Sequence, residues 1–512
     1  MLIIWLVVFL FYSYLAFAVP HRNSFLSPDE NNTYCVAKQI RTRNTVYLHS
    51  HLNEKLGMKI FRGRLYVEAG KNRYTAFNSL GLSFLVAGGM YLGLAFFVVP
   101  FLASLGAIGI YLVLKEMAGE RAGLMASALY GLLPTNVFIS NQILDATPSF
   151  SMYLVSLGCI LAATKRKSVF LPAISGTALG LCFFIRQANA IYIIALLALL
   201  FTLRKKLDMR QWSAFLATAG TMALATMTMN KLVYGSLYRS GQIAGSKGGP
   251  FQTIFPKMDF NAVLNSLSNH LVAYLPLLLV LGIVGFVLAC KGKPGTSMKA
   301  LNTFMASLAV LTVVSYASRS GTWSFSTYSI TSSMARYFIP LFAVVIIYAS
   351  LYLEYALRRG RKTAVLLVLT VTLCMYALFT FGDLEYMNLQ RLVTRAETIG
   401  QAKASLLASF DQPIVVFTKH CDKDLYDDVQ VGLCYTREDV AREPDIKALF
   451  PIVDIEREVL PAIDHLLEDG YLVLAASDCP ELLVTLTERG YRTSRSEEYN
   501  SLYVVRKSEK QE

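Results

Sequence analysis

The sequence predicts an α-helical integral membrane protein with about eleven transmembrane helices and a small C-terminal α/β domain. Hydrophobic residues make up 54% of the 512 residues and charged residues only 16%, against about 25% in soluble domains. The apolar residues come in runs of roughly 17–22, the length that a helix needs to cross the hydrocarbon of a bilayer. The net charge of +13 comes largely from short clusters between these runs, so it indicates membrane topology and not nucleic-acid binding.

The first apolar run, Leu2 to Val19, is predicted to be a retained membrane anchor. Ala16-Phe17-Ala18 resembles a signal-peptide cleavage site, but no basic region precedes the run and its apolar stretch is long. The stretch 74–93 is apolar but rich in Gly and Ser, and it is predicted to be an interfacial or re-entrant helix, with a twelfth span as the alternative. The other predicted spans are 96–114, 122–139, 147–164, 169–185, 187–203, 211–229, 269–290, 300–317, 337–357 and 363–381.

The distribution of basic residues predicts a cytoplasmic N-terminus. With this orientation all five inside loops are short and basic, as the positive-inside rule requires. The loops 20–73, 230–268 and 318–336 and the tail then lie outside the cell membrane. We therefore expect a membrane domain over 1–383, with 20–73 as its outer catalytic loop, and an extracytoplasmic domain over 384–512. The inside cations are Lys115, Arg121, Lys165, Arg166, Lys167, Arg204, Lys205, Lys206, Arg210, Lys291, Lys293, Arg358, Arg359, Arg361 and Lys362.

The tail has the polarity of a soluble α/β domain. Buried strands are predicted at 414–417, 471–474 and 502–505, and Ser477-Asp478 is predicted to cap a helix that contains Pro480 and ends at Gly490. The tail has no glycine-rich phosphate loop, so its expected role is structural or in docking. Its three cysteines, Cys421, Cys434 and Cys479, allow one disulfide.

An acidic pair, Asp29 and Glu30, follows the first span in the segment Ser27-Pro28-Asp29-Glu30-Asn31. The ordinary interpretation is a solvated loop in which Pro28 starts a turn and Asp29 caps a helix. However, the predicted topology brings further ionisable residues to the same outer surface, namely Asp145, Arg186 and Arg336. Ionisable groups at membrane depth are costly, and they therefore indicate function. For Arg186 the alternative is a side chain that extends to the interface.

Several short motifs recur in order along residues 1–350. They are the Asp29-Glu30 pair; Gly63-Arg64-Leu65-Tyr66 with Tyr91-Leu92-Gly93; Pro134 to Asp145 with Pro148-Ser149-Phe150; Gly176 to Arg186; Asn230 with Tyr234-Gly235-Ser236 and Ser240-Gly241; and Arg336-Tyr337-Phe338-Ile339-Pro340. In this order the chain resembles the GT-C superfamily of polytopic glycosyltransferases, especially the group of protein mannosyltransferases and lipid A aminoarabinose transferases. A Pro-Gly pair common near the end of the first loop in that group is missing here, where the chain has Asn72-Arg73-Tyr74.

The resemblance implies a GT-C-like fold and inverting transfer of a sugar from a polyprenyl-phosphate donor to an envelope glycan, lipid or protein at the outer face. Asp29 would accept the acceptor's proton, which is general base catalysis. Glu30 and Asp145 would orient acceptor or base, or hold a metal. The donor phosphate would be bound by Arg186, Arg336, and Lys71 or Arg73, because a guanidinium group binds phosphate in a bidentate manner. Substrate binding is assigned to Tyr66 and Tyr337.

Weaker signals have ordinary explanations. His49 and His51 share the first loop with the acids and would complete a site for a divalent metal, or they are plain loop residues. Tyr316, Trp323 and Tyr328 would stack on sugar or lipid together with Tyr337, or they form an interfacial aromatic belt.

Two rival functions also stay open. A transporter or flippase of lipid-linked sugars would hold its ionisable residues near mid-membrane, and a non-catalytic assembly subunit would tolerate loss of the acids.

Overall fold

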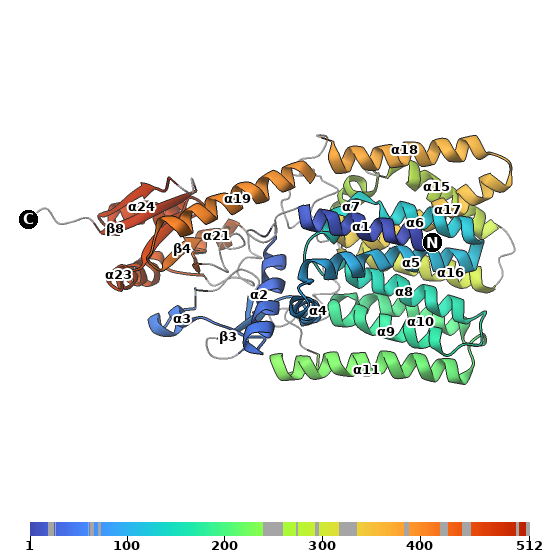
Figure 1. Ribbon diagram of the computed structural model, residues 1–512, viewed down its shortest axis with the longest axis horizontal. Helices are drawn as coiled ribbons and strands as arrows, with labels where there is room; N and C mark the ends of the chain where they lie inside the picture. The colour runs from blue at the N-terminus through green and yellow to red at the C-terminus, as the bar shows by residue number, and fades with distance from the viewer. Residues whose placement is uncertain are drawn as a thin grey trace, which may run out of the picture. The chain divides into compact units, whose positions relative to one another are not determined.

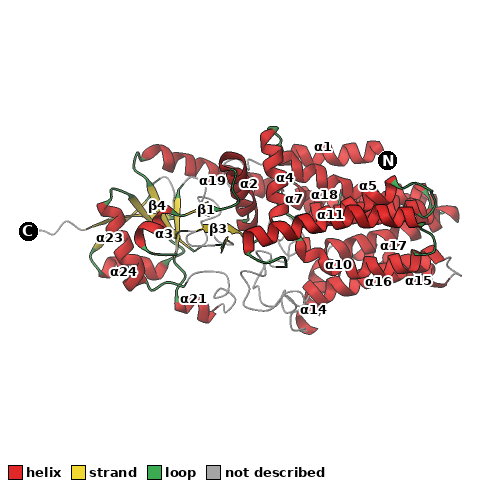
Figure 2. Cartoon of the chain, turned by 90° about the horizontal axis from the view of Figure 1, so that it is seen from below, coloured by secondary structure: helices red, strands yellow, loops and turns green. Residues whose placement is uncertain are grey.

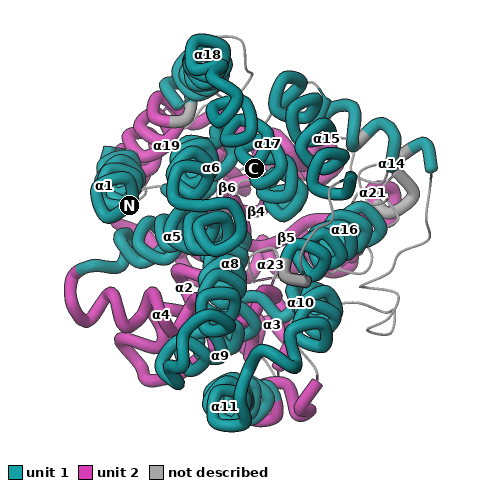
Figure 3. The backbone as a smooth tube through the Cα atoms, turned by 90° about the vertical axis from the view of Figure 1, so that its right-hand side faces the viewer, with its two compact units in different colours: residues 1–18, 94–230, 248–392 teal, residues 19–93, 231–247, 393–512 magenta. Residues whose placement is uncertain are grey.

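The chain forms two compact units, each described here by itself (Figure 3). Residues 1–18, 94–230 and 248–392 make the first unit, and residues 19–93, 231–247 and 393–512 make the second. The computed structural model describes residues 1–18, 25, 27–59, 61, 66–69, 73–238, 260–272, 275–291, 296–316, 335–382, 389–419, 429–442, 452–497 and 501–507.

The first unit is a bundle of helices (Figures 1 and 2). Its central helices are α8 and α17, which are almost entirely buried, whereas most of α18 is exposed. The helices and helical turns are α1 (Leu2–Ala18), η1 (Ala95–Phe97), α5 (Val98–Ala118), α6 (Glu120–Gly131), α7 (Pro134–Ser140), α8 (Ala146–Ala163), α9 (Phe170–Ile185), η2 (Gln187–Asn189), α10 (Ala190–Leu203), α11 (Met209–Tyr234), α14 (Phe260–Leu267), η3 (Ser268–Val272), α15 (Pro276–Lys291), α16 (Thr296–Tyr316), η5 (Ala335–Phe338), α17 (Ile339–Arg358) and α18 (Lys362–Phe381).

Small residues bring the central helices close together. A side chain at Gly109 of α5 would meet the backbone of Leu154 in α8 at 2.5 Å, so only glycine fits there. Gly176 of α9 has the same role toward α11, where a Cβ would meet the Thr218 hydroxyl at 2.2 Å. Close approach through glycine is typical of helix pairs in membranes, where packing and not water exclusion holds helices together.

Each predicted span overlaps at least one helix among the described residues, but the count of eleven is not confirmed. In the described part of the chain, five helices are long and apolar enough to cross a membrane, or six when α6 and α7 count as one span bent by 57°. The helices α1, α9 and α15 are apolar but have only 17, 16 and 16 residues. The span predicted over 269–290 begins as a regular helix only at Pro276.

The outer loop of the second unit contains more structure than the sequence predicts. It has α2 (Pro28–Arg43), β1 (Leu48–His49), α3 (His51–Leu56) and β2 (Tyr66–Glu68), and it ends at the start of β3 (Arg73–Ala76). The apolar stretch after β3 forms α4 (Leu80–Tyr91). The strands form a sheet in the order β1-β3-β2. Strands of two to four residues are too short to show alternation in the sequence. The predicted apolar helix over 74–93 is shorter than expected, because its first residues belong to β3.

The tail forms the predicted α/β structure. Its elements are α19 (Leu389–Ser409), β4 (Ile414–Thr418), β5 (Gln430–Leu433), α21 (Arg437–Arg442), η6 (Ile455–Val459), α23 (Leu460–Glu468), β6 (Leu472–Ala476), α24 (Pro480–Glu488), β7 (Tyr491–Arg495) and β8 (Leu502–Lys507). The sheet order is β5-β4-β6-β8-β7, with β4 parallel to β5 and β6 and with β8 antiparallel to both of its neighbours. The sequence missed β5 and β7, of which β7 is polar and largely exposed.

Two predicted helix caps were wrong. The N-cap of α2 is Ser27, whose side chain accepts a hydrogen bond from the Asp29 backbone NH, so Asp29 lies inside the first turn. The N-cap of α24 is Cys479 and not Ser477-Asp478. Cys479 cannot cap through its side chain because it forms a disulfide with Cys434. That bond confirms the one disulfide that the sequence allowed.

The outer loop and the tail share one hydrophobic core. Leu52 and Phe61 from the loop lie among buried residues of the tail, such as Val415 and Phe417. The rings of Phe61 and Phe417 are 5.9 Å apart, centroid to centroid. Lys55 adds an exposed ion pair with Asp469 at 2.6 Å. The predicted division at residue 383 stays a prediction, and periodicity within each segment gave no sign of this shared core.

Candidate functional site

Four of the predicted site residues lie together inside the first unit and are called here the arginine cluster: Asp145, Arg186, Arg336 and Tyr337. Arg186 Nη1 donates a hydrogen bond to Asp145 Oδ1, and these side chains are only 7% and 6% exposed. Arg336 Nη2 donates to the Tyr337 hydroxyl at 3.1 Å. The Tyr337 ring centroid is 5.2 Å from Cζ of Arg186 and 5.0 Å from Cζ of Arg336. One aromatic ring therefore contacts both guanidinium groups.

The arginine cluster forms where three helices begin or end. Asp145 is the N-cap residue of α8, but its side chain makes no capping bond to that helix. Arg186 ends α9 in an extended conformation, φ −145° and ψ 99°, which separates α9 from the turn η2. Arg336 lies in η5, directly before α17. Because helices begin or end at Asp145, Arg186 and Arg336, these side chains turn toward one another. On a continuous apolar helix they would point toward lipid.

The arginine cluster buries three ionic side chains close together. Asp145 and the two arginines are at least nine-tenths buried, and among the described residues no group donates a hydrogen bond to Asp145 Oδ2. Both guanidinium groups lie beside the Tyr337 ring and line the same small cavity. Burying ionic groups at membrane depth is costly, so two buried arginines on one cavity are a candidate site for an anion. A phosphate would suit it, because guanidinium presents parallel donors to phosphate oxygens.

The wall around the arginine cluster includes residues that the sequence did not mark. A small cavity, with room for about one water molecule, is lined by the arginines, Tyr337, Asn189 and Tyr192, among others. Asn189 Nδ2 donates to Ser149 Oγ at 2.9 Å and so joins η2 to α8. The signal that could have found Asn189 is its position three residues after Arg186, within the same break between helices.

The acidic pair lies in the second unit, at the start of α2. Asp29 Oδ1 accepts a hydrogen bond from Asn78 Nδ2 at 3.0 Å. Glu30 is fully buried. Both carboxylates occupy the first turn of α2, where unpaired backbone NH groups and the helix dipole favour negative charge. Asp29 is only partly buried, so it is the more accessible of the two acids.

The remaining predicted residues are dispersed over the second unit. Arg73 is exposed on β3, with its Cζ 5.9 Å from the Tyr47 ring centroid. Tyr66 is 2% exposed on β2. Lys71 lies outside the described residues, as do Trp323 and Tyr328 of the predicted aromatic group. The assignments of Tyr66, Lys71 and Arg73 to substrate or phosphate stay predictions.

A metal centre is not supported by the part of the chain that the structure describes. Within it, no group of three or more His, Cys, Asp or Glu side chains is placed to hold a metal ion. His49 lies 3.8 Å from Glu54, and both side chains are about half exposed. Two ligands on an exposed loop fall short of the three or four protein ligands of a typical zinc site.

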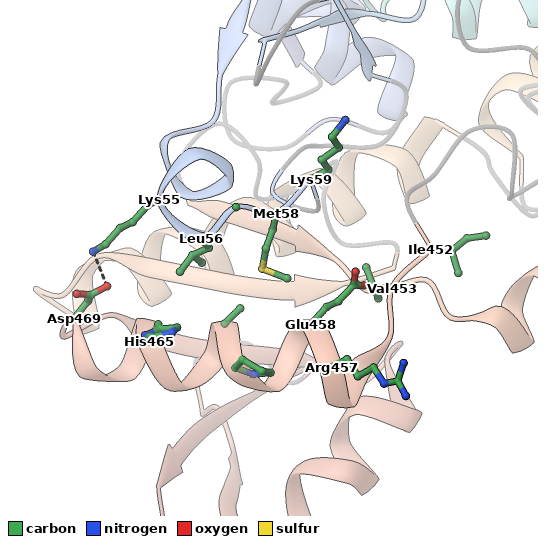
Figure 4. A pocket seen from close by; sticks show the side chains of 13 residues that line it. Lys55, Leu56, Met58, Lys59, Ile452, Val453, Arg457, Glu458, His465 and Asp469 are labelled. Atoms are coloured by element: carbon green, nitrogen blue, oxygen red, sulfur yellow. Dashed lines mark hydrogen bonds and ion pairs between the residues drawn. The ribbon is translucent and has the colours of Figure 1, made fainter.

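A cavity of about 820 Å³ lies elsewhere in the second unit, between residues 55–59, which include the end of α3, and helix α23 (Figure 4). Leu56 and Met58 point toward α23, and the ion pair of Lys55 with Asp469 lies at one end. None of the predicted site residues lines this cavity. Because its walls are partly apolar and two of its charged groups already neutralise each other, it is a weaker candidate than the arginine cluster.

A second buried charge network lies at the carboxyl ends of β4 and β6, where α/β folds commonly bind ligands. Lys419 Nζ donates to Asp439 and to Glu481, each at 2.8 Å. Asp478 accepts hydrogen bonds from the Thr418 hydroxyl and from the Lys419 backbone. Burial lowers the pKa of Lys419, but the two carboxylates outweigh burial and raise this pKa above its ordinary value. Burial likewise opposes ionisation of Asp439, yet the bond from Lys419 leaves the pKa of Asp439 lowered.

Comparisons with known proteins identify the fold. No protein-family model matches the chain, and no curated protein matches it. Among solved structures, ArnT from Cupriavidus metallidurans bound to undecaprenyl phosphate has a TM-score of 0.63 at 12% identity, over 98% of this chain and 97% of that one. The Archaeoglobus fulgidus oligosaccharyltransferase in complex with Zn and sulfate has a TM-score of 0.54 at 13% identity, over 98% of this chain and 72% of its own.

A third structure, the same oligosaccharyltransferase tethered with an acceptor peptide, gives a TM-score of 0.52 at 12% identity, over 99% of this chain and 74% of its own. These are GT-C glycosyltransferases. The predicted resemblance to the GT-C fold is therefore confirmed. At such low identities the likeness is one of fold, and the chemistry has to be argued from the side chains.

Proposed function

We propose that this protein is an inverting glycosyltransferase that takes a sugar from a polyprenyl-phosphate donor at the outer face of the cell membrane. The observation that carries the proposal is the arginine cluster, in which two buried guanidinium groups border one aromatic ring and line one cavity. An anionic phosphodiester suits such a site, because each guanidinium presents parallel donors to phosphate oxygens. The donor's lipid tail suits a bundle of apolar helices, and the GT-C fold is consistent with both features.

The proposed reaction is a direct displacement. The acceptor's hydroxyl oxygen forms a bond to the anomeric carbon as the bond from that carbon to the phosphate oxygen breaks. The hydroxyl proton passes to Asp29, and the bonding electrons leave with the lipid phosphate. Arg186 and Arg336 bind that phosphate and stabilise its growing negative charge, which is commonly the largest catalytic contribution. A base such as Asp29 contributes roughly 10²–10⁴-fold.

The other assigned residues have supporting roles in this proposal. Asp145 holds Arg186 in place through their buried ion pair. Tyr337 contacts both guanidinium groups and would border the donor sugar. Glu30 would orient the acceptor or Asp29. Arg73 or Lys71 would provide a further cation for the donor, and Tyr66 a contact with substrate. The acceptor would be an envelope glycan, lipid or protein.

The disulfide supports an extracytoplasmic tail. Cys434 and Cys479 are both buried and bonded to each other, and such bonds persist mainly outside the reducing cytosol. This argument is independent of the positive-inside pattern, and it agrees with the cytoplasmic N-terminus that the pattern predicts.

A transporter of lipid-linked sugars is the second candidate, and one observation favours it. The helices α6 and α7 are together long and apolar enough to cross a membrane, but they are bent by 57°, and transporters use broken helices at their binding sites. A transporter would move the donor across the bilayer without breaking the sugar–phosphate bond.

One reconstituted assay separates the two functions. The protein in liposomes would receive a radiolabelled polyprenyl-phosphate sugar together with envelope glycan, lipid or peptide acceptors. We expect label to pass to an acceptor, and the Asp29→Asn variant to lose at least about 100-fold in rate. Arg492→Ala, at an exposed position of the tail, is the control and should leave the rate unchanged. Label that crosses the bilayer on an intact donor would favour the transporter, and full activity of Asp29→Asn would remove Asp29 as the base.

A further inference from the structure

We propose that Asn78 is a positioning residue for Asp29, an inference that rests on the proposed function. The Asn78 amide donates to Asp29 Oδ1 at 3.0 Å. Asn78 is only 7% exposed, whereas Asp29 is more accessible. The two residues are far apart in sequence, so the contact depends on the fold of the outer loop. The bond fixes one oxygen of the carboxylate and thereby the plane in which the group meets a substrate.

The backbone that carries Asn78 is held on both sides. It lies between β3 and Ser79, the N-cap residue of α4. In β3, the Thr75 hydroxyl donates to the Val46 carbonyl at 2.9 Å, and the Tyr234 hydroxyl donates to the Ala76 carbonyl at 3.0 Å. A side chain on such a supported segment keeps its direction. This is the arrangement by which a supporting residue fixes a reactive group.

The chemistry of the contact also suits a base. An amide NH that donates to a carboxylate favours its ionised form, which is the form that accepts a proton. The first turn of α2 adds the field of the helix N-terminus in the same direction. Loss of the Asn78 amide would remove the hydrogen bond to Asp29 Oδ1 and loosen the orientation of the carboxylate. Such a change affects the rate of the chemical step more than binding of the donor.

The test compares Asn78→Ala with Ser50→Ala in the full-length protein. Ser50→Ala removes the buried hydrogen bond that caps α3 in the same unit, which is not part of the support of Asn78. We expect Asn78→Ala to lower kcat by about 10–100-fold, the usual cost of losing a supporting partner, with the KM for the donor nearly unchanged. Ser50→Ala should lower Tm and keep kcat within about twofold. Equal losses of kcat in the two variants, or unchanged kcat in Asn78→Ala, would overturn the inference.

A reciprocal exchange provides the second measurement. The double variant Asp29→Asn with Asn78→Asp keeps an amide and a carboxylate at hydrogen-bond distance but reverses their positions. We expect its Tm to recover relative to Asn78→Ala while kcat stays as low as in Asp29→Asn. Recovery of kcat would show that position does not matter and would overturn the inference. A wild-type protein without transfer activity, or an active Asp29→Asn, would instead overturn the proposed function and this inference with it.

Discussion

The arginine cluster of the first unit and the Lys419 network of the tail are both buried groups of charges, but they differ in what surrounds the cations. Lys419 contacts two carboxylates, and a third accepts from its backbone and from Thr418. In the arginine cluster, two guanidinium groups border one neutral aromatic ring and line a small cavity. A cation that is bonded to carboxylates holds a fold together, whereas guanidinium groups on a cavity present donors to a ligand. The position of Lys419 at the carboxyl ends of two parallel strands would have suggested a ligand site, but its bonds to carboxylates argue for a structural role.

The largest expected effect is in the arginine cluster. In the proposed reaction Arg336 stabilises the leaving phosphate, so we expect Arg336→Ala to lower kcat/KM by about 10²–10³-fold. Transfer from a radiolabelled polyprenyl-phosphate sugar measures it, with Arg492→Ala as the exposed control. Activity within threefold of wild type would mean that this buried cation is structural, like Lys419.

The next effect is in the tail. Lys419→Met leaves Asp439 and Glu481 close together without their shared cation, so we expect a loss of about 3 kcal/mol in the free energy of unfolding. Glu481 keeps 24% of its side chain exposed, which places the loss at the low end for a broken buried pair. Thermal unfolding of the purified protein measures it. At temperatures below unfolding, transfer should be unchanged, and a specific loss of transfer by the folded variant would contradict the structural role.

The pH dependence of tail stability should be smaller and has a definite sign. The folded-state pKa of Asp439 is lowered from 3.8, so its stabilising contribution is present above pH 3.8 and is lost as the pH falls through the lowered value. The folded-state pKa of Lys419 is raised from 10.5, so its contribution is present below pH 10.5. We therefore expect Tm to be flat near neutral pH and to fall below about pH 4. In Asp439→Asn the fall of Tm at acidic pH should be shallower. If Tm falls as steeply as in the wild type, other carboxylates cause the loss of stability.

The smallest expected effect tests the aromatic ring between the arginines. Tyr337→Phe keeps the ring over both guanidinium groups but removes the hydroxyl that accepts from Arg336. We expect a loss of about tenfold in kcat/KM, since one hydrogen bond to a charged group contributes roughly 1.5–3 kcal/mol and the low end of that range corresponds to about tenfold. Tyr337→Leu, which also removes the ring, should cost more. Equal losses in the two variants would assign the contribution to the hydroxyl alone.

Residues in the membrane part of the chain were predictable because their chemistry contrasts with their local sequence. Arg186 stands between two apolar runs, and Asp145 and Arg336 each begin one, so all three were candidates from the sequence. The structure brings them together with Tyr337. Their roles in phosphate binding, and the participation of Asp29 in the same reaction, stay predictions. Helix positions were also predictable from hydrophobic runs, whereas their number as full spans was not.

Contacts between distant polar or apolar residues were not predictable. Asn78 and Asp29 each fit an ordinary loop, and nothing in either segment indicates that they share a hydrogen bond. Leu52 and Phe61 also look like isolated apolar residues of a polar loop, and their partners lie in the tail. The strands β1 to β3 are too short for periodicity to show. These features depend on contacts between segments that are far apart in sequence. Local patterns in a single sequence do not indicate such contacts.

The core shared by Phe61 and Phe417 has a consequence for biosynthesis. A ribosome makes Phe61 long before Phe417, so the apolar side chains of the nascent loop lack these partners until the tail has been translated. Contacts of such long sequence separation form slowly. Premature termination before the sheet would therefore leave Leu52 and Phe61 without their partners in the tail. Translation through the tail is thus a condition for closing this core.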